Sequence, residues 1–396
     1  MTDTIEELLT RGVANIIPNK QELSTLLSSK RKLNIYLGID PTATKIHLGH
    51  AVPLRKLQAF AEMGHNVTFL IGDFTALIGD TSDKDTERPV LTSEEIHENF
   101  QTYKKQAEKI LDFSKVTVKH NSEWLSKLDF KEVVKLAQQF DFGEFASREL
   151  IKKRLTDAKH VGLHEALYPT MQGYDSYFMD TDIQIGGTDQ TFNMQAGRTL
   201  QKKWRGKESF VLANEFLVGT DGRKMSKSWG NAIWLEDPPE NMYGKIMAIH
   251  DDVIIEYFTL GTRVSLEKIA EIEKRLKSKE NPRDIKKELA LEIVTELHSK
   301  DAAAKAQEHF EKTVQNKELP TEIPTVTVKN DLNNITDLLI ETGLAESKSK
   351  AKQLIEQGGV EIDNERIETT GKEIVIKDSI IVKVGKRKVI EVKKLT

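Results

Sequence analysis

The sequence lacks cysteine altogether, which excludes disulfides, a thiolate nucleophile and metal sites with cysteine ligands. It also lacks any apolar run as long as the roughly 20 residues that a membrane helix needs, and its first seven residues lack the basic-then-apolar order of a signal peptide. An excess of one charge is missing too, because 58 basic and 62 acidic residues give a net charge of -4. We therefore expect a cytoplasmic protein that contacts no membrane and does not coat nucleic acid along its whole surface.

Short strands alternate with helical segments over the first two-thirds of the chain. Residues 32–39, 66–71 and 115–119 have the pattern of strands, and residues 54–63 and 93–111 between them have the periodicity of helices. Because strands that alternate with helices pair in parallel, this order predicts an α/β fold with a parallel sheet covered by helices. A chain of 396 residues with 38% hydrophobic content can bury such a core and form further domains.

The pattern changes beyond residue 230. Charged amphipathic helices without intervening strands are expected at 265–276, 284–299 and 302–314. Two prolines, Pro320 and Pro324, indicate a linker before a third unit. The expected order is an α/β domain in 1–230, a helical domain in 231–318, a linker in 319–329 and a small α+β domain in 330–396.

Two histidines follow the first predicted strand, in the tetrapeptide His47-Leu48-Gly49-His50. Pro53 behind them fits the first turn of a helix, so both imidazoles are expected at a helix N-terminus. Free backbone N–H groups and the positive end of the helix dipole suit an anion there, and Gly49 lets a flat ring approach the backbone. The tetrapeptide predicts a nucleotide phosphate site; the alternative is a pair of ordinary surface or capping histidines.

A second constellation is the loop from Gly219 to Ser228, which combines two glycines, hydroxyl side chains and the cations Arg223, Lys224 and Lys227. Such a segment can close over a substrate and neutralise a leaving pyrophosphate. Lys227 is the first candidate for that role. The alternative is a solvated surface loop, an interpretation that loses weight once the loop is paired with the histidine motif.

A helix between these motifs carries a polar stripe. Tyr168, Gln172 and Asp175 are four and three residues apart, so they share one face, and apolar residues flank them. This pattern predicts a buried helix whose polar face lines a cavity; a stripe that faces solvent is the alternative. Further on, Gly186-Gly187-Thr188-Asp189 joins a short strand to a helix, with Thr188 as the expected N-cap. Asp189 is a candidate acceptor for a ribose hydroxyl, or part of a structural turn.

Together these segments resemble the tyrosyl-tRNA synthetases, a family of class I aminoacyl-tRNA synthetases. The histidine motif in 42–50 is similar to the HIGH signature and 224–228 to the KMSKS loop of that class. The narrower resemblance is carried by four segments, Tyr36–Thr42, Leu77–Asp80, Tyr168–Asp175 and Gly186–Gln190. It implies a Rossmann-like catalytic domain that activates L-tyrosine with ATP and transfers it to the terminal adenosine of tRNA(Tyr).

The resemblance also implies roles for individual residues. Tyrosine contacts are expected from Tyr36, Asp80, Tyr168, Gln172, Asp175 and Gln190. ATP contacts are expected from Gly38, Asp40, His47, Gly49, His50, Gly187, Asp189, Lys224 and Lys227. The catalytic groups, expected to neutralise the triphosphate, are His47, His50, Lys224 and Lys227. ATP with Mg²⁺ is a co-substrate, and neither a tightly bound cofactor nor a metal site of the protein itself is expected.

The C-terminal unit resembles the small αL RNA-binding module named after a small-subunit ribosomal protein (S-four-like). Its cations form two clusters, and RNA contacts are expected from Lys348, Lys350, Lys352, Lys386, Arg387 and Lys388. A solvated charged surface is the alternative. The resemblance further implies a homodimer, formed through the helices of 130–154.

Two other functions remain open from the residues alone. A nucleotidyltransferase that activates another carboxylate would share the histidine motif but would not explain the RNA module. A non-catalytic RNA-binding paralogue would not explain why His47, His50, Lys224 and Lys227 are all present. Tyrosine-dependent exchange of pyrophosphate into ATP distinguishes the three functions, because only a tyrosine-activating enzyme performs it.

Overall fold

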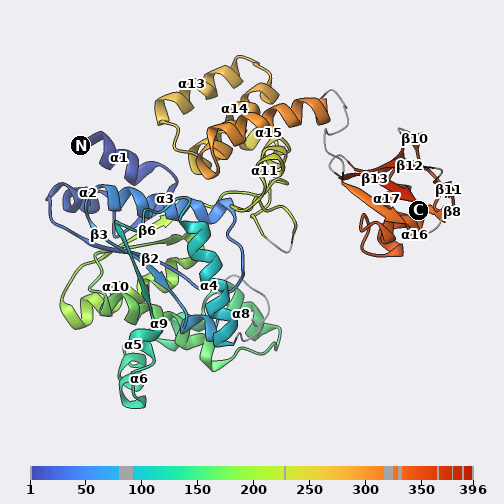
Figure 1. The fold of residues 1–396 in the computed structure, drawn as a ribbon. Coiled ribbons are helices and arrows are strands. Elements are labelled where there is room, and N and C mark those ends of the chain that lie inside the picture. Colours follow the sequence, from blue (N-terminus) through green and yellow to red (C-terminus); the bar gives the residue numbers. More distant parts are fainter. Residues whose placement is uncertain are drawn as a thin grey trace. The chain divides into compact units, whose positions relative to one another are not determined.

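The computed structural model describes residues 2–79, 92–226, 229–315, 324–328, 332–363, 365–376, 378–385 and 388–394. The chain divides into two compact units, Met1–Ala304 and Lys305–Thr396, which are coloured blue to orange and orange to red in Figure 1. No helix among the described residues is both long and apolar enough to cross a bilayer.

A six-stranded sheet forms the centre of the first unit, in the order β1-β6-β5-β2-β3-β4. Its strands are β1 (Val13–Ile17), β2 (Asn34–Ile39), β3 (Asn66–Ile71), β4 (Val116–His120), β5 (Ile183–Gly187) and β6 (Phe210–Asn214). All neighbours pair in parallel except β1, which runs antiparallel to β6 at the edge. The predicted parallel sheet is confirmed, and β1 and β6 add two strands to those expected.

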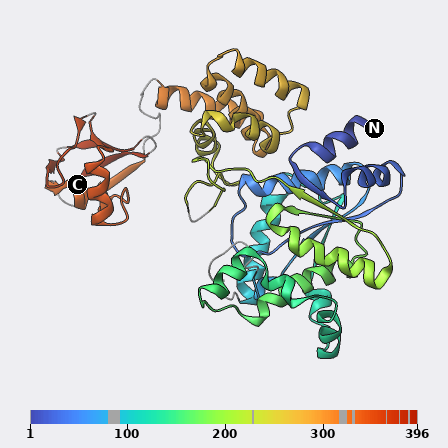
Figure 2. The ribbon, with the colours of Figure 1, turned by 180° about the vertical axis from the view of Figure 1, so that it is seen from behind.

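The strands form a buried sheet because their sequences are apolar on both faces. Every residue of β6 is buried, as is typical of a parallel strand with helices on either side. Figures 1 and 2 show α3 on one face of the sheet and α9 and α10 on the other. The helices and short turns of this part are α1 (Thr2–Thr10), α2 (Lys20–Ser28), α3 (Leu48–Glu62), η1 (Thr75–Leu77), α4 (Ser93–Ala107), α5 (Ser122–Leu125), α6 (Phe130–Ala137), α7 (Phe142–Ala146), α8 (Glu149–Thr156), α9 (Leu163–Phe178), η2 (Thr188–Gln190) and α10 (Thr191–Arg205).

Two local predictions about helix starts are wrong. Helix α3 begins at Leu48, so Pro53 lies in its second turn rather than its first. Thr188 opens the turn η2 instead of capping a helix, and α10 begins only at Thr191 after an N-cap at Gln190.

A run of helices follows β6 in the first unit, as the sequence predicts. Its members are α11 (Pro239–Met247), the turn η3 (Asp251–Val253), α12 (Ile254–Gly261), α13 (Leu266–Lys277) and α14 (Pro282–Leu297). The next helix, α15 (Lys300–Phe310), and the π-helical turn η4 (Glu311–Gln315) cross into the second unit. Helix α12 packs against α3, so the helical run contacts the helix that begins at the predicted histidine motif.

The second unit is the small α+β fold that the sequence predicts. Its five-stranded sheet has the order β10-β9-β12-β13-β7, and a separate pair is formed by β11 and β8. The elements are β7 (Thr325–Val328), β8 (Leu332–Asn334), α16 (Ile335–Glu341), α17 (Lys348–Glu356), β9 (Val360–Ile362), β10 (Glu365–Arg366), β11 (Glu373–Val375), β12 (Ser379–Val384) and β13 (Lys388–Lys394). Ile335, Leu338 and Val382 belong to its own apolar core, so this unit has the means to fold by itself. The finer division at residues 230, 318 and 329 stays a prediction.

Candidate active site

A cavity of about 970 Å³ opens at the carboxyl ends of the parallel strands in the first unit. Strand β2 ends at its centre, where the chain order reverses from β3 and β4 on one side to β5 and β6 on the other. Open α/β sheets bind ligands at this kind of switch point. The predicted site residues that line the cavity are Tyr36, Gly38, Asp40, His47, Gly49, His50, Tyr168, Gln172, Asp175, Gly187, Asp189, Gln190 and Lys224. Asp80 and Lys227 lie outside the residues that the structure describes.

The bottom of the cavity holds a buried carboxylate, Asp175 on α9, with 2% of the residue exposed. It accepts hydrogen bonds from Trp124 Nε1 at 2.7 Å and from Asn121 Nδ2 at 3.1 Å. Burial raises the pKa of Asp175 to about 8, although these two donors act in the opposite direction. A further hydrogen-bond donor, such as a hydroxyl group of a ligand, would stabilise the charged form of this carboxyl group.

Tyr36 on β2 reaches the same cavity, and its hydroxyl donates to Gln184 Oε1 at 3.1 Å. Burial and the nearby charge of Asp175 raise the pKa of Tyr36, so its hydroxyl keeps its proton. Gln184 in turn donates to the Met194 carbonyl at 2.9 Å, which fixes its amide. A tyrosine hydroxyl from β2 and a carboxyl group from α9 therefore both line the cavity.

A chain of hydrogen bonds connects Asp175 to Asp40, at the end of β2. Asn121 donates to Thr75 Oγ1 at 3.0 Å, and Thr75 donates to Asp40 Oδ1 at 2.8 Å. Asp40 Oδ2 accepts from the Tyr168 hydroxyl at 2.8 Å. Gly72 makes room for this chain, since a Cβ there would lie 2.0 Å from Asp40 Oδ1 and 2.4 Å from Thr75 Oγ1. The chain therefore orients the Tyr168 hydroxyl, whose residue lines the cavity.

The two histidines lie at the N-terminus of α3, as predicted, with His47 as the N-cap. Their rings are 3.8 Å apart between centroids, and His50 Nδ1 accepts from the His47 backbone N–H at 3.3 Å. The pKa of His47 is lowered to about 2 and that of His50 to about 4, mainly by burial, and the charge of Lys224 contributes to both shifts. At neutral pH both imidazoles are uncharged in the empty site, and His50, whose Nδ1 accepts, has its proton on Nε2 as a donor. The catalytic roles of His47 and His50 stay predictions.

In the same cavity, the predicted loop meets the predicted ribose acceptor. Lys224 Nζ lies 3.3 Å from Asp189 Oδ2 and 4.6 Å from the centre of the Phe216 ring. The Lys224 side chain is 45% exposed, so this pair is weak and breaks readily when a ligand competes for either partner. Inside the loop, Asn231 accepts from the Ser226 backbone N–H at 2.8 Å and donates to Asp221 at 2.7 Å.

In the first turn of α9, Glu165 forms a buried ion pair with Arg154 of α8. The guanidinium contacts both carboxylate oxygens, at 2.7 and 2.9 Å, and also donates to the His160 carbonyl. Glu165 in addition accepts from the Gly162 backbone N–H at 2.8 Å. The pair fixes the start of α9, and with it the register of the three polar residues on that helix.

Four residues that shape the cavity were not predicted from the sequence: Thr75, Asn121, Trp124 and Gln184. One sequence signal existed for Gln184, a lone amide between Ile183 and Ile185 in an apolar strand. Asn121 directly follows a strand, a position that often faces a site at the carboxyl edge of a sheet. Among the described residues, no group of three His, Asp or Glu side chains is arranged to hold a metal ion.

In the second unit, the predicted RNA contacts lie on exposed parts of α17 and β13. Lys348, Lys350 and Lys352 are exposed on α17, and Lys388 is exposed at the start of β13. Lys348 also pairs with Asp337 at 2.7 Å. Lys386 and Arg387 lie outside the described residues. The four described members of the two clusters are therefore accessible charges.

Comparison with known proteins agrees with the geometry. Residues 28–315 match the family described as tRNA synthetases class I (W and Y), and residues 315–391 match the tyrosine–tRNA ligase SYY-like C-terminal domain. The chain is 45% identical over 384 residues to the tyrosine–tRNA ligase of Thermotoga maritima, covering 96% of this chain and 95% of that protein. It is 44% identical over 379 residues to tyrosine–tRNA ligase 2 of Vibrio cholerae, with 96% and 95% covered.

Solved structures give the same result. The tyrosyl-tRNA synthetase of Archaeoglobus fulgidus, complexed with L-tyrosine, superposes with a TM-score of 0.62 at 25% identity, covering 77% of this chain and 99% of that one. A truncated mitochondrial tyrosyl-tRNA synthetase of Aspergillus nidulans reaches 0.66 at 23% identity, over 78% and 93%, and supports the fold alone. Because both family models match and the 45% identity extends over 96% of the chain, the chain belongs to the tyrosine–tRNA ligases, a family of class I aminoacyl-tRNA synthetases.

Proposed function

We propose that this chain activates L-tyrosine with ATP, giving tyrosyl-adenylate and pyrophosphate, and then transfers the tyrosyl group to tRNA(Tyr). The observation that carries the proposal is the buried carboxylate of Asp175 beside the Tyr36 hydroxyl at the bottom of a cavity. A phenol fits this pair, because its O–H donates to the carboxylate and its oxygen accepts from Tyr36 once the Tyr36 hydroxyl turns from Gln184 to the ligand. A phenylalanine ring would leave both buried groups without that partner, which costs free energy.

The other end of the amino acid meets a second set of polar groups. The Tyr168 hydroxyl is oriented by Asp40 and is proposed to contact the ammonium group, and Gln172 lines the cavity one turn further along α9. Asp80 is proposed to contribute a negative charge here, and Gln190 is proposed to contact the carboxylate. This arrangement leaves the tyrosine carboxylate pointing toward the histidines and Lys224.

In the first step, a carboxylate oxygen of tyrosine bonds to the α-phosphorus of ATP while the bond to pyrophosphate breaks. The nucleophile is ionised at neutral pH, so no general base is required. The neutral His50 donates a hydrogen bond to phosphate, and Lys224, together with Lys227, supplies positive charge as pyrophosphate leaves. Mg²⁺ arrives with ATP as part of the substrate. Asp189 accepts from the ribose once Lys224 has released it.

In the second step, a ribose hydroxyl of the terminal adenosine of tRNA attacks the tyrosyl carbonyl, and AMP leaves. The exposed cations of the second unit, Lys348, Lys350, Lys352, Lys386, Arg387 and Lys388, are proposed to hold phosphates of the tRNA. These reactions belong to the cytoplasm, where tRNA, ATP and tyrosine are available.

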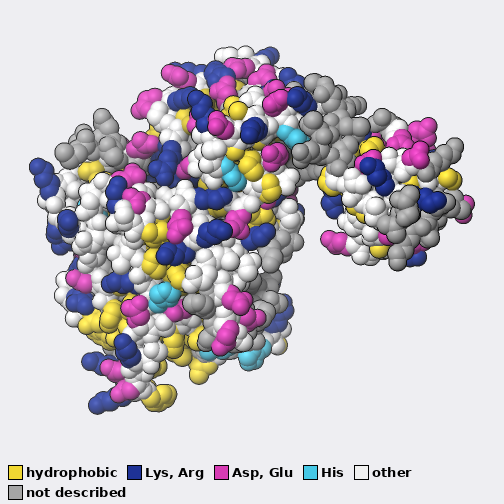
Figure 3. Space-filling view, viewed as in Figure 1, with side chains coloured by type: hydrophobic (Ala, Val, Ile, Leu, Met, Phe, Trp, Pro, Cys, Tyr) yellow, Lys and Arg dark blue, Asp and Glu magenta, His cyan; other side chains and the backbone are white. Residues whose placement is uncertain are grey.

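A homodimer is proposed to form through the helices of 130–154. Figure 3 shows hydrophobic side chains gathered at the end of the first unit where α5 and α6 lie. Phe130 is 83% exposed and Phe142 62%, and Val134 and Leu155 are also exposed. Large apolar side chains clustered at the surface indicate an interface with another protein surface.

The first prediction concerns pH. Because the pKa of Asp175 in the empty site is about 8, tyrosine binding should release a proton from this carboxyl below pH 8. The dissociation constant of tyrosine should therefore rise by more than about tenfold between pH 8 and pH 6. Calorimetric titration at both pH values measures it, with Asp175→Asn as the variant that should bind weakly at either pH. Equal tyrosine affinity of the unaltered protein at pH 6 and pH 8 would contradict the assignment.

The second prediction concerns Lys224. Replacement by alanine should lower the maximal rate of tyrosine-dependent pyrophosphate exchange by about 10²–10³-fold, because the ammonium stabilises charge that develops in the transition state. Tyrosine affinity should stay the same. Arg223→Ala is the matched control: it removes a cation from the same loop, one that stacks on Trp229 and pairs with Asp221. A loss of tyrosine binding in Lys224→Ala, with the rate unchanged, would sink the assigned role.

The third prediction concerns assembly. Phe130→Asp should convert a dimer into a species with the single-chain mass of 44.9 kDa, measured by sedimentation equilibrium, since a charge cannot be buried in an apolar interface without cost. Val375→Asp, at an exposed apolar residue of the second unit, should leave the mass at twice that value. A single-chain mass for the unaltered protein would refute the proposed dimer.

The fourth prediction concerns the second unit. A chain ending at Glu322 keeps every residue assigned to tyrosine and ATP, so pyrophosphate exchange should continue at nearly the full rate. Charging of tRNA should fail, and tRNA affinity should lose most of its salt dependence because the clustered cations are gone. Both reactions are compared in long and short chains at several salt concentrations. Parallel loss of the two activities would show that the second unit supports the catalytic fold instead.

A further inference from the structure

Helix α12 (Ile254–Gly261) lies outside the cavity, and none of its residues, all of which the structure describes, lines it. It nevertheless contacts both segments that carry the proposed catalytic groups. One end of the helix is bound to α3, which begins at the two histidines, and its side chains are bound to the base of the loop that carries Lys224.

The C-terminal end of α12 is held by two guanidinium groups. The last four carbonyls of a helix have no partner within it and form the negative end of its dipole. Arg11 donates to the carbonyls of Phe258 and Thr259, at 3.2 and 2.8 Å. Arg55, on α3, donates to those of Leu260 and Gly261, at 3.2 and 2.8 Å.

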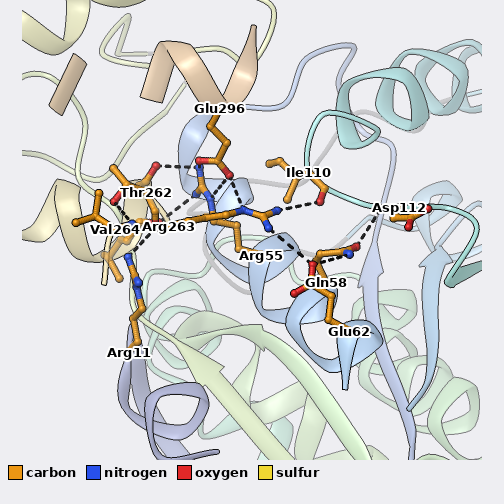
Figure 4. A network of polar contacts seen from close by, with 12 residues as sticks. Arg11, Arg55, Gln58, Glu62, Ile110, Asp112, Thr262, Arg263, Val264 and Glu296 are labelled. Atoms are coloured by element: carbon orange, nitrogen blue, oxygen red, sulfur yellow. Dashed lines mark hydrogen bonds and ion pairs between the residues drawn. The ribbon is translucent and has the colours of Figure 1, made fainter. Parts of the chain in front are cut away.

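The same Arg55 is fixed in turn by Glu296 of α14. Its Nε and Nη2 contact the two carboxylate oxygens, each at 3.0 Å, and Arg263 approaches the carboxylate at 3.1 Å (Figure 4). The side chains of Arg55 and Glu296 are only 11% and 15% exposed, so the pair is largely shielded from solvent. The bidentate geometry leaves α12 little freedom to slide or rotate against α3.

The side chains of α12 hold the loop at Val218. The Tyr257 hydroxyl donates to the Val218 carbonyl at 2.8 Å, and Glu256 Oε1 accepts from the Val218 N–H at 3.1 Å. Tyr257 is fully buried, and burial raises its pKa, so the hydroxyl keeps the proton that it donates. Val218 pairs in antiparallel fashion with Lys224 across the loop. Both main-chain groups at the loop base are therefore fixed by consecutive residues of one helix.

These contacts form a continuous path between the two catalytic segments. Arg55 follows His50 by five residues on α3, about 7.5 Å along the helix axis. From Arg55 the path runs through the end of α12 to Tyr257, and from there through Val218 to Lys224. Every link is a hydrogen bond or a strand bridge between residues that the structure describes.

We propose that α12 is a brace that sets the position of Lys224 relative to His50, and that Tyr257 is a positioning residue for adenylate formation, acting through Val218. This inference rests on the proposed role of Lys224. Displacement of a charged group by about 1 Å can cost on the order of 10²-fold in rate, so the hydrogen bond of Tyr257 matters for the transition state. Tyrosine binding depends on Asp175 and Tyr36, which the brace does not contact.

The test is Tyr257→Phe, which removes one oxygen and keeps the buried ring. The maximal rate of pyrophosphate exchange should fall about three- to tenfold, the size expected for one hydrogen bond, with the dissociation constant of tyrosine unchanged. Thr259→Val is the matched control, because it removes a hydroxyl of the same helix that donates only to the Ile255 carbonyl. That control should leave the rate unchanged.

Two further comparisons keep the test decisive. In a Lys224→Ala background, Tyr257→Phe should change the remaining rate by less than twofold, because its effect is exerted through Lys224. Glu256→Gln, which keeps an acceptor oxygen for Val218, should retain most of the rate that Glu256→Ala loses. If Tyr257→Phe folds poorly, Glu256→Gln and Glu256→Ala test the brace in its place.

The outcomes separate the two hypotheses. If Tyr257→Phe lowers the melting temperature but not the rate per folded molecule, the hydroxyl only supports the fold and the brace is refuted. An equal fold-change with and without Lys224 would refute the path through Lys224. If Lys224→Ala alone keeps the full rate, the proposed catalytic role fails, whatever Tyr257→Phe shows.

Discussion

A carboxylate buried at the bottom of the cavity is the constraint on which the rest of the site depends. Asp175 is shut off from bulk water, so its lone pairs need donors from the protein, and Asn121 and Trp124 supply them. The donors come from the segment after β4, whereas Asp175 is on α9, and the three hydrogen bonding groups therefore fix α9 against the edge of the sheet. Separating them would leave a buried polar group without its hydrogen bonds, at a cost of about 1–3 kcal/mol.

The need of buried polar groups for hydrogen-bond partners links the tyrosine end of the cavity to its ATP end. Asn121 is shared with Thr75, and Thr75 with Asp40, so no member can turn without leaving a buried polar group unsatisfied. One chain of hydrogen bonds thus orients side chains from β2, η1, the segment after β4 and α9. Groups that are oriented before a substrate arrives need no reorganisation during the reaction, which is the usual source of electrostatic catalysis.

What the sequence could predict was local, and what it could not predict depended on burial and on long-range pairing. The sheet, the helix start at His47 and the shared face of Tyr168 and Asp175 follow from periodicity and spacing within a few residues. Gln184 has the appearance of an ordinary core position, and the partners of Asp175 lie more than 50 residues away in the chain. The uncharged state of the histidines depends on how deeply the fold buries them, which no local pattern encodes.

Because both histidines are uncharged, the positive charge for the reaction must come from other residues. Burial makes two charged imidazoles too costly at this position, so cations have to come from the exposed loop, where Lys224 stays hydrated until a substrate binds. Contacts inside the loop, such as those of Asn231, determine its shape but not its position in the molecule. Position has to be set from outside the loop, and the contacts of α12 with Val218 are the ones that link the loop to the helix of His50. Tyr257 lies outside the cavity, and it therefore affects the reaction through the position of Lys224, the charged residue on the loop.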